Sequence, residues 1–320
     1  MGRIAYVNGR YLPHAAAAVH VEDRGYQFGD GVYEVCEVHE GALIDEERHM
    51  MRLRRSLGEL RIDWPLQPAA LAIVMRRVIT RNKVTNGYVY VQVTRGVAPR
   101  DHAFPAKPVR PSLVVTASSA DPAKAQATAE KGVAVVSCPD LRWKRPDIKT
   151  ICLLPNVLAR QAAREQGAYE AWLVDEDGMV TEGAACNAWI ISPDGVVITR
   201  QADTSILRGV TRTTLIDLLA AEGLSFQERK FSLAEAKKAK EAFITGATTL
   251  VMPVVRIDGE AIGDGKPGPL ARRLREKFHA VAKRSLATHA PAQNASFSSK
   301  RPSKRNDRTE RPRSTLLSRA

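Results

Sequence analysis

Lys149 is the side chain whose surroundings best suit nucleophilic chemistry. It stands in the stretch Asp147-Ile148-Lys149-Thr150, after an apparent strand over 133–136 with a turn-like segment at 137–140, and before an apolar helix over 157–166. A lysine between two rigid elements can be held against a cavity, and an amine whose pKa is lowered by burial or by neighbours can form a Schiff base with a carbonyl group. Because most lysines are solvated surface charges, the position alone does not assign this role.

Glu182 and the segment 206–212 offer a carboxylate and an anion site. Glu182 closes a strand expected over 179–182 and enters a loop of small residues. A buried carboxylate that faces a pyridine nitrogen keeps this nitrogen protonated and makes the ring an electron sink. Residues 206–212 open a helix expected over 213–222, and their glycine, threonine and free N–H groups suit a phosphate. The alternatives are a carboxylate at the rim of the fold and an ordinary capped helix.

The loop 94–102 contains a candidate carboxylate-binding pair. Its residues Arg100 and His102 are two positions apart. A guanidinium group binds a carboxylate with two parallel hydrogen bonds, and the histidine adds a second donor. The alternative is a solvated loop with scattered charges.

The length and composition indicate two globular domains that frame these residues. The chain has 320 residues, of which 44% are hydrophobic, and one domain usually takes about 100–200 residues. A Pro- and Ala-rich connection interrupts the chain, and the apolar periodicity disappears near its end. We expect an N-terminal α+β domain, an interdomain linker, a C-terminal domain that carries the chemistry and a basic disordered tail, over residues 1–120, 121–131, 132–284 and 285–320.

Periodicity predicts the elements of both domains. In the first domain, a hairpin turn at Asn8-Gly9 and a glycine-rich loop over 24–31 precede a strand over 32–38. Apolar stripes at helical spacing predict the helices of the first domain. The remaining expected helices are 46–61, 68–82, 233–239 and 270–283, and the remaining expected strands are 87–94, 112–116, 171–174, 188–192 and 196–199.

The net charge of +13 is concentrated in the tail. From Lys283 to Ala320, ten basic and two acidic residues give +8, so residues 1–282 carry only +5 and give no reason to expect nucleic-acid binding by the fold. The run 300–305 would bind an anionic polymer only through non-specific charge. We find no run of 18 apolar residues and no secretory signal. Four widely spaced cysteines, without metal-ligand spacing, favour the cytoplasm and predict no metal site.

The run Glu-Asp-Arg-Gly-Tyr-Gln-Phe-Gly-Asp-Gly-Val-Tyr-Glu-Val over residues 22–35 resembles the N-terminal signature of bacterial D-amino-acid aminotransferases. These belong to the class IV, fold-type IV pyridoxal-phosphate aminotransferases. Further segments that resemble this family follow in the same order, at 95–102, 147–149, 180–183 and 207–212. The resemblance covers roughly residues 1–280. It implies a two-domain fold-type IV architecture of mixed α+β and α/β character, with pyridoxal 5'-phosphate as the cofactor.

The resemblance also implies a role for each matching residue. Lys149 would bind the cofactor as a Schiff base and carry the substrate proton, while Glu182 would pair with the pyridine nitrogen. The substrate carboxylate would be held by Tyr33 together with Arg100 and His102, and in the family these last two come from the partner subunit, so the assembly implied is a homodimer. The remaining implied cofactor contacts are Arg52, Leu207, Val210, Thr211, Gly246, Ala247 and Thr248.

Two departures from the family pattern bear on substrate preference. Ala184, Ala185 and Cys186 stand where the family often has serines, and Ala247 stands where relatives commonly have a threonine. We expect transamination between a D-amino acid, of the D-alanine or D-glutamate type, and a 2-oxo acid such as 2-oxoglutarate or pyruvate. A branched-chain L-amino-acid aminotransferase and an aminodeoxychorismate lyase share the fold and remain alternatives.

Overall fold

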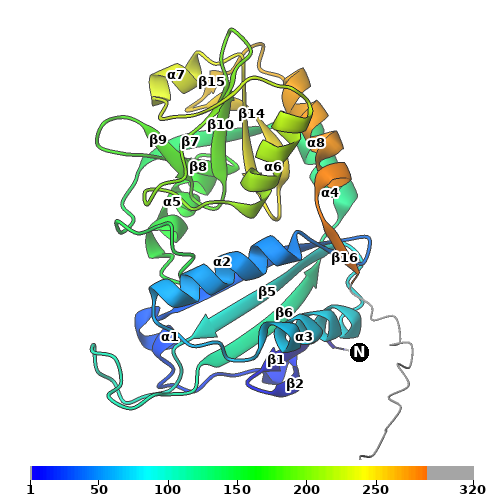
Figure 1. The fold of residues 1–320 in the computed structure, drawn as a ribbon. Helices are drawn as coiled ribbons and strands as arrows, with labels where there is room; N and C mark the ends of the chain where they lie inside the picture. The colour runs from blue at the N-terminus through cyan, green and yellow to red at the C-terminus, as the bar shows by residue number, and fades with distance from the viewer. Residues whose placement is uncertain (1, 287–320) are drawn as a thin grey trace, which may run out of the picture. The chain divides into compact units, whose positions relative to one another are not determined.

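The computed structural model describes residues 2–286, which contain two β-sheets and the helices that cover them (Figure 1). Both sheets belong to one compact unit of the chain. Within residues 2–286, no helix combines the length and the apolar character that a membrane span requires.

The first sheet has seven strands in the order β16-β4-β3-β5-β6-β1-β2. Its neighbouring strands are all antiparallel. The strands are β1 (Ile4–Val7), β2 (Arg10–Pro13), β3 (Gly31–His39), β4 (Ala42–Ile44), β5 (Gly87–Thr94), β6 (Ser112–Ser119) and β16 (Arg284–Leu286). The helices of this half are η1 (His14–Ala16), α1 (Arg24–Phe28), α2 (Glu46–Glu59) and α3 (Pro68–Arg81).

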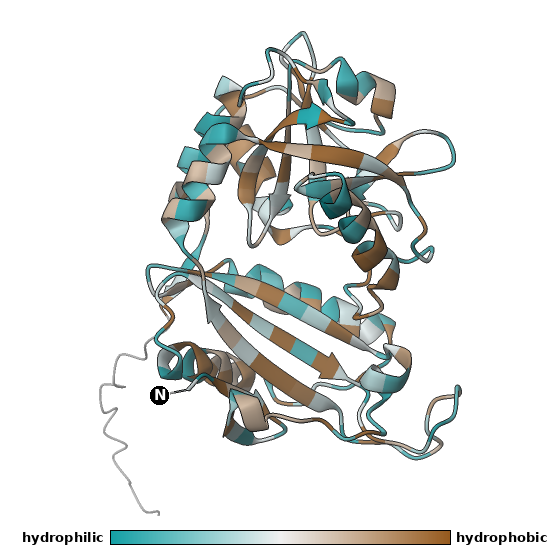
Figure 2. Ribbon diagram, turned by 180° about the vertical axis from the view of Figure 1, so that it is seen from behind, coloured by the Kyte–Doolittle hydropathy of each residue, from teal (hydrophilic) through white to brown (hydrophobic). Residues whose placement is uncertain are grey.

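The two faces of β3 contact different parts of the molecule, because successive side chains of a strand point to opposite sides. Val32, Cys36 and Val38 join the core that α2 and α3 supply with apolar residues. Figure 2 shows how hydrophobic and more polar residues alternate along the strands of this sheet. On the other face, Tyr33 and Val35 line a pocket. The alternation that predicts the strand therefore also delivers side chains to that pocket.

The second sheet has nine strands, with the main order β12-β11-β10-β13-β14-β7-β8-β9 and β15 paired to β14. Helix α5 packs on β8 and β7, while α6 and α8 pack on β13 and on each other. The strands are β7 (Val133–Pro139), β8 (Glu170–Val174), β9 (Val180–Gly183), β10 (Asn187–Ile191), β11 (Val197–Thr199), β12 (Phe226–Glu228), β13 (Glu241–Gly246), β14 (Leu250–Ile257) and β15 (Glu260–Ala261). The helices are α4 (Pro122–Lys131), α5 (Leu154–Glu165), α6 (Val210–Ala221), α7 (Leu233–Lys237) and α8 (Pro269–Val281).

The segment after α8 connects the two halves. Strand β16 pairs with β4 of the first sheet. Asp45 and Lys283 exchange backbone and side-chain hydrogen bonds, since the Asp45 N–H donates to the Lys283 carbonyl and the Lys283 N–H donates to Asp45 Oδ1. The Thr214 hydroxyl of α6 donates to Asp45 Oδ2 at 2.6 Å. Asp45 therefore joins three elements that are far apart in the sequence.

Several expected boundaries require correction. The segment 137–140, expected as a turn, mostly belongs to β7, which continues to Pro139. The glycine-rich loop at 24–31 contains the short helix α1, whose N-cap Asp23 accepts a hydrogen bond from the Gly25 N–H. Helices α5 and α6 each begin three residues earlier than expected.

The expected connection over 121–131 is largely the helix α4. Of the expected tail, Ser285 and Leu286 lie in β16, and residues 287–320 are outside the described part of the chain.

Candidate functional site

A cavity of about 340 Å³ lies between the first sheet and the second. This volume is in the range that small-molecule sites occupy. Strand β3 and helix α2 contribute to its wall from one half, and four further segments, 142–156, 182–187, 207–211 and 245–248, complete it. The sequence-predicted residues among its lining are Tyr33, Arg52, Lys149, Glu182, Leu207, Val210, Thr211, Gly246, Ala247 and Thr248.

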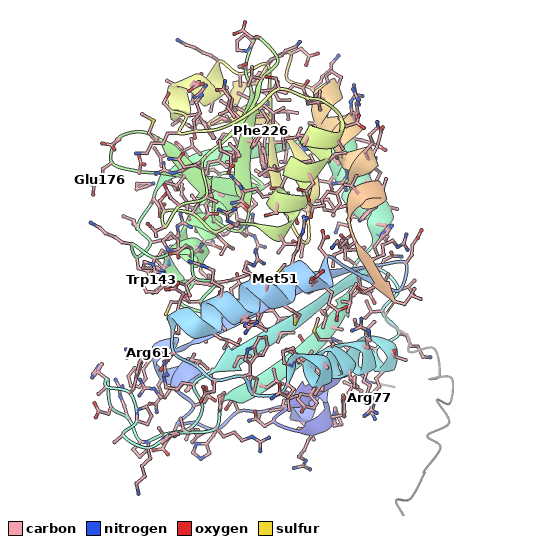
Figure 3. All side chains as sticks on the ribbon, viewed as in Figure 1. Met51, Arg61, Arg77, Trp143, Glu176 and Phe226 are labelled. Carbon is pink, nitrogen blue, oxygen red and sulfur yellow. The ribbon has the colours of Figure 1, made fainter. Side chains whose placement is uncertain are left out.

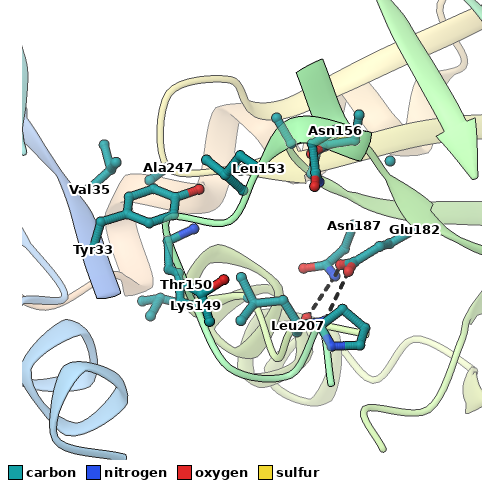
Figure 4. A pocket seen from close by; sticks show the side chains of 18 of the residues that line it. Tyr33, Val35, Lys149, Thr150, Leu153, Asn156, Glu182, Asn187, Leu207 and Ala247 are labelled. Atoms are coloured by element: carbon teal, nitrogen blue, oxygen red, sulfur yellow. Dashed lines mark hydrogen bonds between the residues drawn. The ribbon is translucent and has the colours of Figure 1, made fainter. Parts of the chain in front are cut away.

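Lys149 is held by the first half of the molecule. Its carbonyl accepts a hydrogen bond from the Tyr33 N–H at 3.0 Å, and its own N–H donates to Ser56 Oγ at 3.2 Å. The Nζ atom lies 4.0 Å from the centre of the Tyr33 ring (Figure 4). No carboxylate among residues 2–286 forms an ion pair with this amine. The lysine backbone is thus fixed while its amine faces the cavity.

Glu182 lies on the opposite side of the cavity in Figure 4 and is buried, with 4% of its surface exposed. Its Oε1 accepts hydrogen bonds from the Leu207 N–H at 3.0 Å and from Arg142, and its Oε2 accepts one from Asn187 Nδ2 at 2.9 Å. Burial raises the pKa of this carboxyl, and the charge of Arg142 offsets the rise only in part. The Glu182 carboxyl is therefore held in a fixed position, and its ionised form is less favoured than that of an ordinary glutamate.

Sequence reasoning missed Arg142, which lines the cavity beside Glu182. Its guanidinium also binds both oxygens of Asp140, at 2.9 and 2.7 Å. Asp140 ends the segment 137–140, which was interpreted as a turn, and Arg142 follows it, so neither residue was assigned to the site. The sequence does carry a signal for Arg142. It is an arginine that stands two positions after an acidic residue and shortly before the reactive lysine.

Arg52 lines the cavity from α2, and Glu34 holds it there. Glu34 accepts from Arg52 Nε at 2.7 Å and from Arg52 Nη2 at 2.8 Å, while His49 Nδ1 lies 2.7 Å from Oε2. Burial raises the pKa of Glu34, but the charge and hydrogen bonds of Arg52 and His49 outweigh it and lower the pKa to about 2. Glu34 and His49 were also missed. Their signal was the spacing of His49 and Arg52, which places both on one side of a helix.

The N-terminus of α6 presents backbone donors to the cavity. Gly209 is the N-cap and no side chain caps the helix, so the first N–H groups, including those of Val210 and Thr211, have no intrahelical acceptor. A Cβ at Gly209 would lie 2.1 Å from Asn187 Oδ1, so this close approach requires glycine. The loop residues Gly246, Ala247 and Thr248, which connect β13 to β14, line the same cavity.

This geometry fits a cofactor that carries a phosphate, an aldehyde and a protonated ring nitrogen. An uncapped helix N-terminus binds phosphate through free N–H groups and the helix dipole. A lysine amine and a buried carboxylate face the same space from different sides. The residues that depart from the family pattern also line the cavity, and they present methyl groups at Ala184 and Ala185 and a buried thiol at Cys186.

Arg100 and His102 do not line the cavity of their own chain. Both are exposed in the loop after β5. The Arg100 guanidinium lies 4.8 Å from the centre of the Phe28 ring, and the His102 ring lies 5.5 Å from the same ring. Arg24 secures this loop by donating to the Asp101 carbonyl at 2.6 Å. One chain alone therefore does not bring these two side chains to Lys149.

Comparison with known proteins places the chain in one family. The sequence model of the family described as amino-transferase class IV matches residues 31–257. The D-alanine aminotransferase of Bacillus licheniformis is 40% identical over 83% of this chain and 93% of the relative, and that of Staphylococcus haemolyticus is 38% identical over 86% and 96%.

Two solved structures show the same fold. A branched-chain amino acid aminotransferase with pyridoxamine 5'-phosphate, from the organism abbreviated T.th., is 26% identical, with a TM-score of 0.80 over 87% of this chain and 93% of the other. The branched-chain aminotransferase from Escherichia coli, at 24% identity, has a TM-score of 0.78 over 88% and 94%. The expected fold class and cofactor are confirmed. The chain belongs to the class IV aminotransferase family, whose members depend on pyridoxal phosphate.

Proposed function

We propose that this protein transfers the amino group of a D-amino acid, of the D-alanine or D-glutamate type, to a 2-oxo acid such as pyruvate or 2-oxoglutarate. The observation that carries the proposal is the convergence of Lys149, Glu182 and the uncapped α6 N-terminus on one cavity. The D-alanine aminotransferases at 37–40% identity support the D-amino acid as substrate. When bound, pyridoxal phosphate supplies an electron sink for the negative charge that develops at the substrate Cα.

Each cavity residue then has a distinct task. Lys149 Nζ would hold the cofactor covalently, and the same amine would move the proton of the substrate Cα. Glu182 holds a proton at the pyridine nitrogen. Arg52 and the N–H groups at the start of α6 bind the phosphate, together with the loop 246–248. Leu207 would pack against the cofactor ring, and Tyr33 would contact the substrate carboxylate, since both side chains line the cavity.

We infer a homodimer in which Arg100 and His102 of each chain complete the other chain's site. Large apolar side chains are exposed at the cavity and near it, among them Trp143, which lines the cavity and is labelled in Figure 3. Exposed apolar surface of this kind is typical of protein–protein interfaces. On α5 these side chains have helical spacing at Leu154, Val157 and Leu158. An interface at this surface supports a contact between loop 94–102 of one chain and the site of the other chain.

The first experiment tests the chemistry with the variants Lys149→Ala and Lys144→Ala. The purified protein is expected to show the visible absorbance band of lysine-bound cofactor, and Lys149→Ala is expected to lose this band and at least about 10³-fold of the transamination rate. Lys144→Ala is the matched control, because Lys144 is exposed and does not line the cavity. A Lys149→Ala protein with full activity would refute the proposal.

The second experiment tests the substrate. D-alanine and L-leucine are assayed separately with 2-oxoglutarate, and faster turnover of D-alanine is expected. Faster turnover of L-leucine would instead support a branched-chain L-amino-acid aminotransferase, the kind of protein that the two solved structures represent. Formation of 4-aminobenzoate from aminodeoxychorismate would indicate the lyase.

The third experiment tests the shared site by mixing two inactive variants, Lys149→Ala and Arg100→Ala, under conditions that exchange subunits. A hybrid dimer has one site with both residues intact only if Arg100 is lent across the interface. Random exchange is then expected to restore about a quarter of the wild-type activity. No restoration in hybrids confirmed by mass would place Arg100 in its own chain's site.

A cytoplasmic location also remains a proposal. The four cysteines, all within the described residues, are free thiols, which supports a reducing compartment. Measurement of enzyme activity in separated cell fractions tests it. The contact of run 300–305 with an anionic polymer, considered from the sequence, falls outside the described residues.

A further inference from the structure

A second cluster of chemically active side chains lies outside the cavity. Glu37 and His39 of β3 and His279 of α8 each offer a ligand atom, and these atoms lie within 4.8 Å of one another. None of the three residues lines the cavity. All three are half-buried, so water can still reach the cluster.

The backbone explains why the three groups meet. Glu37 and His39 are two positions apart on a strand, so their side chains project from the same face of β3. Helix α8 brings His279 to this face from the second half of the molecule (Figure 1). The His39 and His279 rings stack with centroids 3.8 Å apart and planes only 7° from parallel. His279 Nε2 lies 3.0 Å from Glu37 Oε1.

The donor set is that of a zinc site with an open position. Zn²⁺ binds imidazole nitrogen at about 2.0–2.1 Å and carboxylate oxygen at about 2.0–2.2 Å, in tetrahedral geometry. Such bond lengths place two bound nitrogens about 3.4 Å apart. The three ligand atoms lie within 4.8 Å of one another, so they are close to this separation. Because imidazole lone pairs lie in the ring planes, one of the two stacked rings must turn out of the stack before both nitrogens and the carboxylate oxygen face one ion.

The charges around the cluster balance before a metal binds. Arg284 pairs with Glu40 at 3.0 Å on one side of His39. The Arg275 guanidinium, on α8, interacts electrostatically with Glu37. It also donates hydrogen bonds to the carbonyls of Thr249 and Val251. Glu40 is thus already paired with Arg284, while the guanidinium near Glu37 is held by two backbone carbonyls.

We propose that Glu37, His39 and His279 form a binding site for a divalent transition-metal ion of the Zn²⁺ type, with water as the remaining ligand. The ion fastens the end of β3 to α8. It thereby joins the strand that carries Tyr33 and Glu34 to the helix that packs on β13 and α6. Its effect is on the connection between the two halves and not on the transfer chemistry, so it does not depend on the proposed function.

No metal site was predicted from the sequence, because these three ligands do not stand at the short spacings typical of metal sites. Two of the three ligands follow a Glu-x-His pattern, and the third is 242 residues away from Glu37. Only the folded chain brings them together.

The test uses the full chain, without an affinity tag and loaded with its cofactor, titrated with Zn²⁺ in a buffer free of chelators. Calorimetry is expected to show one equivalent bound, and binding at a hundredfold excess over Kd is expected to raise the melting temperature by about 5 °C. Co²⁺ substitution is expected to give visible d–d absorption of a four-coordinate ion. Absence of stoichiometric binding by the wild-type chain would overturn the proposal.

Variants assign the ligands. His279→Ala and His39→Ala are each expected to weaken Zn²⁺ binding at least about 100-fold while keeping the cofactor absorbance and activity. Glu37→Gln provides a third variant that retains both imidazoles. His20→Ala, at an exposed position, and His289→Ala, in the tail, are the matched controls and are expected to bind like the wild type. Unchanged binding in His279→Ala and Glu37→Gln, or loss of binding in a control, would place the ion elsewhere.

Discussion

Two buried glutamates have pKa values shifted in opposite directions, although each is paired with an arginine: Glu182 lines the cavity, and Glu34 holds the cavity residue Arg52. Glu34 is 1% exposed and its pKa is lowered to about 2, whereas Glu182 is 4% exposed and its pKa is raised. Burial opposes ionisation of both groups. The difference therefore lies in how completely the neighbouring donors compensate for burial.

Arg52 gives two N–H groups to Glu34, and His49 lies within hydrogen-bond distance as a further partner. Arg142 divides its donors between Glu182 and Asp140, and the charge of Asp140 raises the pKa of Glu182 further. An arginine that serves one carboxylate fixes its charge, while an arginine shared by two leaves one of them close to accepting a proton. The first arrangement suits a permanent anchor for Arg52, and the second suits a partner for a protonated ring nitrogen.

The largest effect is expected from Glu34→Ala, because it leaves the Arg52 guanidinium buried without its partner. We expect a loss of about 3–5 kcal/mol in the free energy of unfolding, measured by urea denaturation. Glu40→Ala is the matched control, since Glu40 pairs with Arg284 at the surface, where solvent screens the pair, and its loss is expected to leave the free energy of unfolding nearly unchanged. Equal losses in the two variants would remove the distinction drawn for Glu34.

Glu182→Gln is expected to lower activity without a comparable loss of stability. The amide oxygen still accepts from the Leu207 N–H, but it no longer favours a proton on the ring nitrogen, so kcat is expected to fall about 10²–10³-fold. Steady-state kinetics measure this change. Glu170→Gln is a close control, because Glu170 is also buried with a raised pKa but does not line the cavity. A similar fall in kcat for Glu170→Gln would point to a general effect of buried charge.

The two glutamates are also expected to give opposite slopes of stability against pH. The folded-state pKa of Glu34 is below its ordinary value of 4.5, so its contribution of about 3 kcal/mol is present above pH 4.5 and is lost as the pH falls towards 2. The folded-state pKa of Glu182 is raised, so its ionisation costs stability above that pKa, and protonation relieves the cost as the pH falls towards 4.5.

Unfolding curves between pH 2 and 7 test these slopes in the variants Glu34→Gln and Glu182→Gln. The first is expected to lose the acid slope below pH 4.5, and the second to lose the opposing slope above it. A wild-type slope that survives in Glu34→Gln would assign the acid sensitivity to other carboxylates.

The smallest effect is expected from His49→Asn. Asparagine can keep one donor near Glu34, so the change removes at most one hydrogen bond and is expected to cost about 1 kcal/mol of unfolding free energy. Urea denaturation measures it beside Glu34→Ala. A loss as large as that of Glu34→Ala would show that His49, and not Arg52, is the main partner of Glu34.

The residues that belong to family motifs were predicted from the sequence. The residues that hold these motif residues in place were not. Lys149 and Glu182 were singled out by their places next to expected strands and helices, the family resemblance assigned their roles, and the cavity brings both together. Glu34 and Arg142 act by pairing with cavity residues from other segments, and such pairs become visible only when the chain has folded. Arg142 was further hidden because it follows a segment interpreted as a turn.

The incorrect boundaries have local physical reasons. Pro139 and Asp140 are residues typical of turns, but pairing with β8 extends β7 to Pro139, at the strand end where proline is tolerated. Helix α5 was expected to begin at residue 157, yet Pro155 already occupies its first turn, where the missing N–H costs nothing. In both places a residue that disfavours regular structure stands at the one position that accepts it.

The return of β16 to the first sheet has a consequence for the synthesis of this protein. Asp45 and Lys283, which flank the β4–β16 pairing, are 238 residues apart. At about 5–20 residues per second, a ribosome needs roughly ten to fifty seconds to make the intervening chain. During this interval β4 is an unpaired edge strand, which is a template for pairing with other chains. Until residue 286 has been synthesised, the first sheet therefore ends in an open edge on the side of β4 that β16 later covers.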